Sequence, residues 1–142
     1  MTEPKKYQAL VEDKIFLGGA TDVESMIQNK GVEVAIDLRG EAEKPAFSYP
    51  DVQWVWMMPL RIKFLFLLQA IDKVVNAYKT GKKVAFHYNG GRGRTGTVAA
   101  GTHLTLGLSN TLQEAEEKVK EIKPEINIKP EQKEVLNKLF SN

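Results

Sequence analysis

The sequence predicts an α/β fold: a three-layer domain with a mostly parallel central sheet of four to five strands and helices on both faces. Short runs of β-branched and aromatic residues alternate with segments in which apolar residues recur at helical spacing. The length suits one domain over residues 1–142, and 42% hydrophobic with 27% charged residues is typical of a folded protein. No repeat or Gly/Ser-rich linker divides the chain.

The first half of the chain predicts a hairpin, one helix and two further strands. Residues 7–11 and 14–17 form the hairpin, which ends at a pair of glycines. Thr21 begins a capping box, in which its hydroxyl accepts a hydrogen bond from the amide of Glu24. Gly31 is placed to end this helix in the left-handed conformation. The two strands follow at residues 32–38 and 52–58.

The second half predicts one more strand among four helices. An amphipathic helix covers residues 64–79 and ends at Gly81, and a buried strand follows over residues 83–87. After a glycine-rich turn, small residues favour a helix over 94–106. Two charged helices finish the chain, at residues 111–122 and 130–140.

The composition excludes several classes of function. The chain has no cysteine, which excludes disulfides, thiolate metal sites and thiol catalysis. A net charge of +2 gives no reason to expect a nucleic-acid partner. The longest apolar run, residues 64–68, is too short to span a bilayer, and the N-terminus lacks the apolar stretch of a signal peptide. We therefore expect a cytoplasmic protein with no metal, cofactor or membrane partner, and a monomer, with a weak dimer as the alternative.

A candidate anion site follows the buried strand over residues 83–87. There a glycine-rich loop turns directly into a helix, so that successive backbone N–H groups and the helix N-terminus can point at one spot. Arg94 supplies a planar fork that suits two phosphate oxygens. A glycine-rich turn that binds nothing explains these residues equally well. The predicted anion-binding residues are Asn89, Gly90, Gly91, Arg92, Gly93, Arg94 and Thr95.

This segment resembles the signature loop of the cysteine-dependent protein-tyrosine and dual-specificity phosphatases, H-C-x-x-G-x-x-R-[ST]-G. The matching residues are His87, Gly91, Arg94, Thr95 and Gly96. The resemblance extends to residues 15–19, 34–39 and 55–59, and to Gln132, which falls where the family often has a glutamine near its pocket. It implies the phosphatase fold, a phosphate-binding loop with its arginine, a cysteine nucleophile and an aspartate general acid.

The sequence departs from this family at both reactive positions. Tyr88 stands where the family has its nucleophilic cysteine, and a phenol has a pKa of about 10 and a longer reach from the backbone. No carboxylate lies between Pro59 and Asp72, where the family has its general acid, and Asp72 falls inside a predicted helix. We therefore expect the chain to be inactive by the family's mechanism, with Tyr88 and Arg94 at the former catalytic positions.

Aromatic and apolar residues surround the predicted pocket. Residues 64–66, Phe-Leu-Phe, are expected on a solvent-facing loop, in contact with a small aromatic ligand or a partner, or collapsed into the pocket. Trp54 and Trp56 lie two apart on one strand, which packing explains equally well. His87 is expected to be buried and bonded to backbone. The candidate pocket-lining residues are Trp56, Leu60, Arg61, Phe64 and Gln132.

Three functions are compatible with these residues. The favoured one is a phosphatase-like domain without catalysis that keeps a phosphate- or sulfate-binding loop; it is an engineered scaffold or binding module with a redesigned pocket, or a natural pseudophosphatase. The second is a repurposed enzyme that uses Tyr88 as an acidified phenol or Lys63 as a desolvated amine. The third is a residual phosphoric-ester hydrolase that uses another residue.

Overall fold

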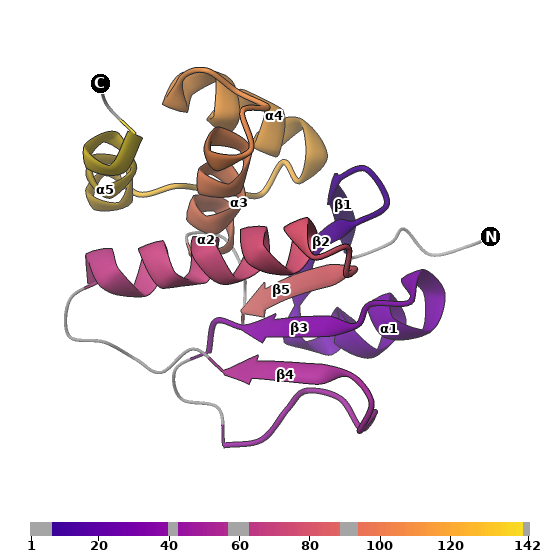
Figure 1. The fold of residues 1–142 in the computed structure, drawn as a ribbon. Coiled ribbons are helices and arrows are strands. Elements are labelled where there is room, and N and C mark those ends of the chain that lie inside the picture. Colours follow the sequence, from indigo (N-terminus) through magenta and orange to yellow (C-terminus); the bar gives the residue numbers. More distant parts are fainter. Residues whose placement is uncertain (1–6, 40–42, 57–62, 89–93, 141–142) are drawn as a thin grey trace.

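A five-stranded sheet forms the centre of the molecule in the computed structural model, which describes residues 7–39, 43–56, 63–88 and 94–140 (Figure 1). The strand order is β1-β2-β5-β3-β4. The strands are β1 (Gln8–Val11), β2 (Ile15–Gly19), β3 (Val34–Asp37), β4 (Gln53–Trp56) and β5 (Val84–Tyr88). The helices are η1 (Ala20–Asp22), α1 (Val23–Lys30), α2 (Lys63–Lys79), α3 (Arg94–Thr105), α4 (Leu112–Ile122) and α5 (Pro130–Phe140).

The sheet is parallel except for its first strand. β1 pairs with β2 in antiparallel fashion, whereas β2 with β5, β5 with β3, and β3 with β4 are parallel pairs. The registers of β3 bring Asp37 opposite His87 on one side and opposite Trp56 on the other. Because parallel strands end at the same edge of a sheet, the last residues of β3, β4 and β5 lie together at one edge.

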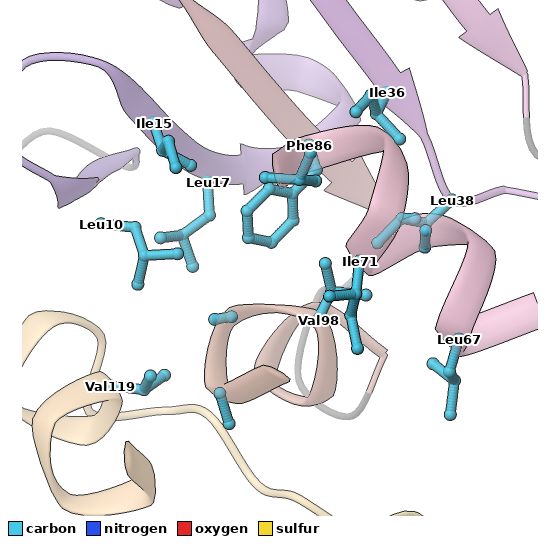
Figure 2. Close-up of a cluster of buried hydrophobic side chains, with 14 of the residues drawn as sticks. Leu10, Ile15, Leu17, Ile36, Leu38, Leu67, Ile71, Phe86, Val98 and Val119 are labelled. Atoms are coloured by element: carbon cyan, nitrogen blue, oxygen red, sulfur yellow. The ribbon is translucent and has the colours of Figure 1, made fainter. Parts of the chain in front are cut away.

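Helices cover both faces of the sheet and confirm the predicted three-layer α/β fold. α1 packs on one face with a smaller core that contains Phe16, Val23 and Met26. α2, α3, α4 and α5 enclose the larger core on the other face. Figure 2 shows part of this larger core, in which strand and helix side chains meet: Ile15, Leu17, Ile36, Phe86, Ile71, Val98 and Val119. Burial on both faces explains why the central strands are almost continuously apolar.

The helix boundaries agree with the predictions except at the start of α1. Gly31 ends α1 with a φ of 71°, and Thr111 caps α4 by accepting a hydrogen bond of 3.1 Å from the Glu114 amide. The predicted capping box at Thr21 is wrong, because Thr21 lies inside η1. Asp22 precedes α1 without capping it through its side chain, and its carboxylate accepts a hydrogen bond of 2.9 Å from the Gly19 amide at the start of η1.

Candidate anion-binding site

The predicted anion site lies where β5 leads to α3. β5 extends to Tyr88, which pairs with Gly19 of β2, and α3 begins at Arg94. The predicted backbone donors between them, Asn89, Gly90, Gly91, Arg92 and Gly93, lie outside the described residues, as does the side chain of Tyr88. The predicted strand and helix on either side of this loop are therefore confirmed, and anion binding by the loop remains a prediction.

Arg94 is held at the N-terminal end of α3 by two other elements. Its Nη1 donates a hydrogen bond of 3.3 Å to the Leu38 carbonyl, directly after β3. Its guanidinium carbon lies 5.7 Å from the centre of the Phe66 ring on α2, within the range of a cation–π interaction. These two contacts place a permanent positive charge at the start of α3, where the helix dipole adds partial positive charge.

Thr95 places a buried hydroxyl in the first turn of α3. Its side chain is fully buried, and Oγ1 has no hydrogen-bond partner in the described part of the chain. A buried hydroxyl without a partner loses its hydrogen bonds to water and gains nothing in return. An oxyanion at the helix N-terminus would supply the missing acceptor.

Gly96 allows the segment after α4 to lie close against the same turn of α3. A Cβ atom at this position would stand 2.5 Å from Cγ2 of Ile126 and 3.3 Å from Cγ1 of Ile128. Since β-branched side chains are stiff, this contact could not be relieved by a simple rotation. The first turn of α3 is therefore held by two contacts: Gly96 packs against residues 126–128, and Arg94 bonds to the Leu38 carbonyl after β3.

A buried carboxylate, Asp37, lies at the end of β3 and was not predicted as a site residue. It is fully buried and accepts two hydrogen bonds from the Arg39 side chain: 2.9 Å from Nε to Oδ1 and 2.7 Å from Nη2 to Oδ2. The Arg39 amide donates to Oδ1 at 2.9 Å, and the indole Nε1 of Trp54 donates to Oδ2 at 2.9 Å. The carboxylate thus accepts four hydrogen bonds.

These contacts keep Asp37 ionised. Burial alone would raise the pKa of Asp37, but the hydrogen bonds from Arg39, together with the neighbouring His87, outweigh burial and hold the pKa well below its usual value of 3.8. Asp37 and His87 come from strands that are far apart in sequence, and the register of β3 and β5 brings them together.

His87 lies beside the Asp37 carboxylate. The sequence instead predicts a bond from its ring to backbone. The imidazole is fully buried, and Nε2 is 3.5 Å from Oδ1 of Asp37. Neither ring nitrogen makes a hydrogen bond of ordinary geometry to the described residues. The expectation of burial is confirmed, and the expected backbone bond from the ring is wrong, because the register of β3 and β5 places the Asp37 side chain beside it.

The two tryptophans of β4 bind the end of β3 through their indole N–H groups. Trp54 is half-buried and bonds to Asp37, whereas Trp56 is 39% exposed and donates from Nε1 to the Arg39 carbonyl at 3.1 Å. Trp54 also packs against the smaller core, whereas Trp56 is the last residue of β4, opposite Asp37, and its predicted role in the pocket remains a prediction.

The structure corrects the placement of residues 64–66. They lie in the first turns of α2 and not on a solvent-facing loop, and Phe66 is only 7% exposed. Phe66 shares its helix face with Ala70, so helical spacing directs it into the core. The side chains of Lys63 and Phe64 and the whole of Leu60 and Arg61 lie outside the described residues. Asp72 is exposed on α2, as expected for a residue within that helix.

Gln132 has a local structural role. Its Oε1 accepts a hydrogen bond of 3.1 Å from the Lys129 amide, across the first turn of α5. This contact caps the start of α5. Its predicted place in the pocket remains untested.

No cluster of three or more acidic, histidine or cysteine side chains that could hold a metal ion occurs among the described residues. Over the same ranges, no helix is long and apolar enough to cross a membrane.

Comparisons with known proteins agree with this architecture. No protein-family model matches the chain. A protein of Invertebrate iridescent virus 3, described as tyrosine phosphatase 067L, is 34% identical over 101 residues. That match covers 63% of this chain and 42% of the viral protein, so the chain spans less than half of its relative.

Solved phosphatase structures resemble the chain over nearly its whole length. Human DUSP28 has a TM-score of 0.80 at 18% identity, with 97% of this chain and 95% of that chain covered. The human tyrosine phosphatase-like serine/threonine/tyrosine-interacting protein has a TM-score of 0.79 at 18% identity, with 96% of each chain covered. A mouse protein described as a dual specificity phosphatase, complexed with zinc tungstate, has a TM-score of 0.79 at 16% identity, with 99% and 89% covered. The chain therefore has the fold of the dual-specificity phosphatases, as the sequence predicts.

Proposed function

We propose that this chain is a phosphatase-fold domain that binds a phosphate-like oxyanion at the N-terminal end of α3 and does not hydrolyse phosphate esters through a cysteine. The chain contains no cysteine, so it cannot form a phosphocysteine intermediate. Tyr88, at the end of β5, stands where the resemblance expects that cysteine. The domain would then act by binding, as a pseudophosphatase or as a scaffold with an altered pocket.

The observation that carries this proposal is the pairing of Arg94 and Thr95 at the start of α3. One supplies a fixed positive charge, and the other supplies a buried hydroxyl with no partner among the described residues. Both act at the positive end of a helix of 12 residues. The mouse neighbour that was crystallised with tungstate supports the same ligand class, since tungstate is a tetrahedral oxyanion like phosphate.

Titration calorimetry with sodium tungstate and inorganic phosphate tests the proposal. Arg94→Ala should lower the affinity of either anion by about tenfold or more, because it removes a charge-assisted contact. Lys138→Ala is the matched control: it removes the same charge from an exposed position on α5 and should leave the affinity unchanged. Equal affinity in the wild type and Arg94→Ala would show that the anion binds elsewhere.

A hydrolysis assay with p-nitrophenyl phosphate tests the proposed lack of catalysis. We expect no turnover above the background given by Arg94→Ala. Turnover that Arg94→Ala abolishes would identify the chain as a working phosphatase and contradict this part of the proposal. It would favour one of the enzyme alternatives, in which Tyr88 or another residue reacts.

A further inference from the structure

The segment that ends β3 contacts the chain both before and after residues 89–93. The Leu38 amide donates a hydrogen bond of 2.9 Å to the carbonyl of His87, near the end of β5. The Leu38 carbonyl accepts the bond of 3.3 Å from Nη1 of Arg94, at the start of α3. Leu38, the residue directly after β3, therefore connects the strand that leads into the candidate site with the helix that follows it.

Asp37 fixes the direction of this segment. Its carboxylate accepts hydrogen bonds from the amide and the guanidinium of Arg39, so the peptide bond between Leu38 and Arg39 is tied to Asp37. Trp54, on β4, also donates to Oδ2 of this carboxylate. The peptide that carries the Leu38 carbonyl is therefore held to the carboxylate through the Arg39 amide.

We propose that Asp37 is a positioning residue of the anion site: by fixing the end of β3, it directs the Leu38 carbonyl toward Arg94 and so sets where the guanidinium stands. This inference rests on the proposed function, because the guanidinium matters only if an anion binds there. Asp37 itself is fully buried, and the carbonyl of the next residue, Leu38, accepts the bond from Arg94.

The chemistry of the cluster favours a specific role over simple packing. Four donors converge on one carboxylate, and His87 lies 3.5 Å away on β5. A buried charge is retained at low cost only when its partners stay in place, so its contacts define one arrangement of the strand end. An apolar residue at this position would pack without selecting any direction for the next carbonyl.

Asp37→Ala is the direct test, with tungstate as the probe. We expect its tungstate affinity, measured by calorimetry, to fall by about tenfold or more, because Arg94 loses its fixed position. Amide hydrogen exchange supplies a readout that needs no ligand. Exchange of the Leu38 amide, which is bonded to His87, should accelerate by about tenfold, while the amides of α4 and α5 keep their rates.

Two further variants keep the test decisive. Trp54→Phe removes one hydrogen bond from Asp37 and keeps an aromatic ring, so it should lower the tungstate affinity by about threefold even if Asp37→Ala does not fold. Val119→Ala is the control for lost stability alone: it leaves a cavity in the core at α4 and should lower the melting temperature with no change in tungstate affinity.

The outcomes separate this inference from the proposed function. Unchanged tungstate affinity in Trp54→Phe and Asp37→Ala overturns the positioning role, as does acceleration of exchange that is equal over all elements. If the wild type binds no tungstate, the proposed function fails, and the Leu38 exchange rate alone decides whether Asp37 fixes the end of β3. A local acceleration together with weaker binding supports both.

Discussion

Tyr88 closes β5 one residue after His87, where the resemblance to the phosphatases expects a thiol. A thiolate at a helix N-terminus is stabilised by the same amides that bind phosphate, whereas a phenol has a pKa of about 10 and reacts from several bonds farther away. The first charged carboxylate after Pro59 is Asp72, which is exposed on α2. We therefore propose that the chain lacks both the nucleophile and the proton donor of the phosphatases and keeps their anion-binding segment.

The variant Tyr88→Cys separates these two losses. We expect it to recover slow hydrolysis of aryl phosphates, because their leaving groups need little protonation. Alkyl phosphates should recover much less, since a missing general acid typically costs about a hundredfold or more. Hydrolysis of p-nitrophenyl phosphate and of an alkyl phosphate by the same variant measures the difference. Equal recovery for both classes would mean that another group protonates the leaving oxygen.

Among the elements, α3 connects the candidate site to the core. Every residue from Thr95 to His103 is buried, and Gly101 lets Ile71 of α2 approach so closely that a Cβ atom would stand 2.3 Å from its Cδ1. Two hydroxyls farther along α3 bond to carbonyls of the helix itself: Thr102 donates to the Val98 carbonyl at 2.7 Å, and Thr105 donates to the Gly101 carbonyl at 2.8 Å. Because α3 is buried from Thr95 to His103, packing against the core fixes the position of the helix and of its first turn.

His103 of α3 makes the stability of the fold depend on pH. Burial lowers the pKa of His103 below its usual 6.5, Lys118 of α4 acts in the same direction, and the contact of Nε2 with the Leu10 carbonyl opposes them. Well above pH 6.5 the histidine is neutral in both states. As pH falls below 6.5, the unfolded chain binds a proton that folded His103 does not, so the free energy of unfolding decreases.

Urea unfolding at about pH 7.5 and pH 5.5 measures this effect. The wild type should lose stability between these two conditions, and His103→Gln, which keeps a donor for Leu10, should lose clearly less. The comparison between the two proteins removes the contribution of every other titrating group. The same loss in both would show that His103 does not carry the dependence.

At the scale of the whole molecule, hydrophobic periodicity and glycine positions predicted the fold. Each predicted strand and helix is present among the described residues, because alternating apolar segments and helix-ending glycines such as Gly31 and Gly81 are local signals. The errors have local and helical causes. Thr21 lies inside η1 and so does not begin α1, and Phe66 faces the core because it lies within α2.

The candidate site was predicted only where its residues are contiguous in sequence. Arg94 and Thr95 were found from the glycine-rich segment that precedes them. The Asp37 cluster was missed because its members come from β3, β4 and β5, and only the parallel registers bring them to one edge. Pairing between strands that are far apart in sequence leaves no periodic signal in a single chain.

The most direct measurement is a crystal of the wild-type protein soaked in sodium tungstate, with the metal located by its anomalous scattering. The account predicts a tungsten peak at the N-terminal end of α3, with tungstate oxygens within hydrogen-bond distance of the Arg94 guanidinium and of Thr95 Oγ1. A well-diffracting crystal with tungstate bound only elsewhere, or with none bound, would contradict it.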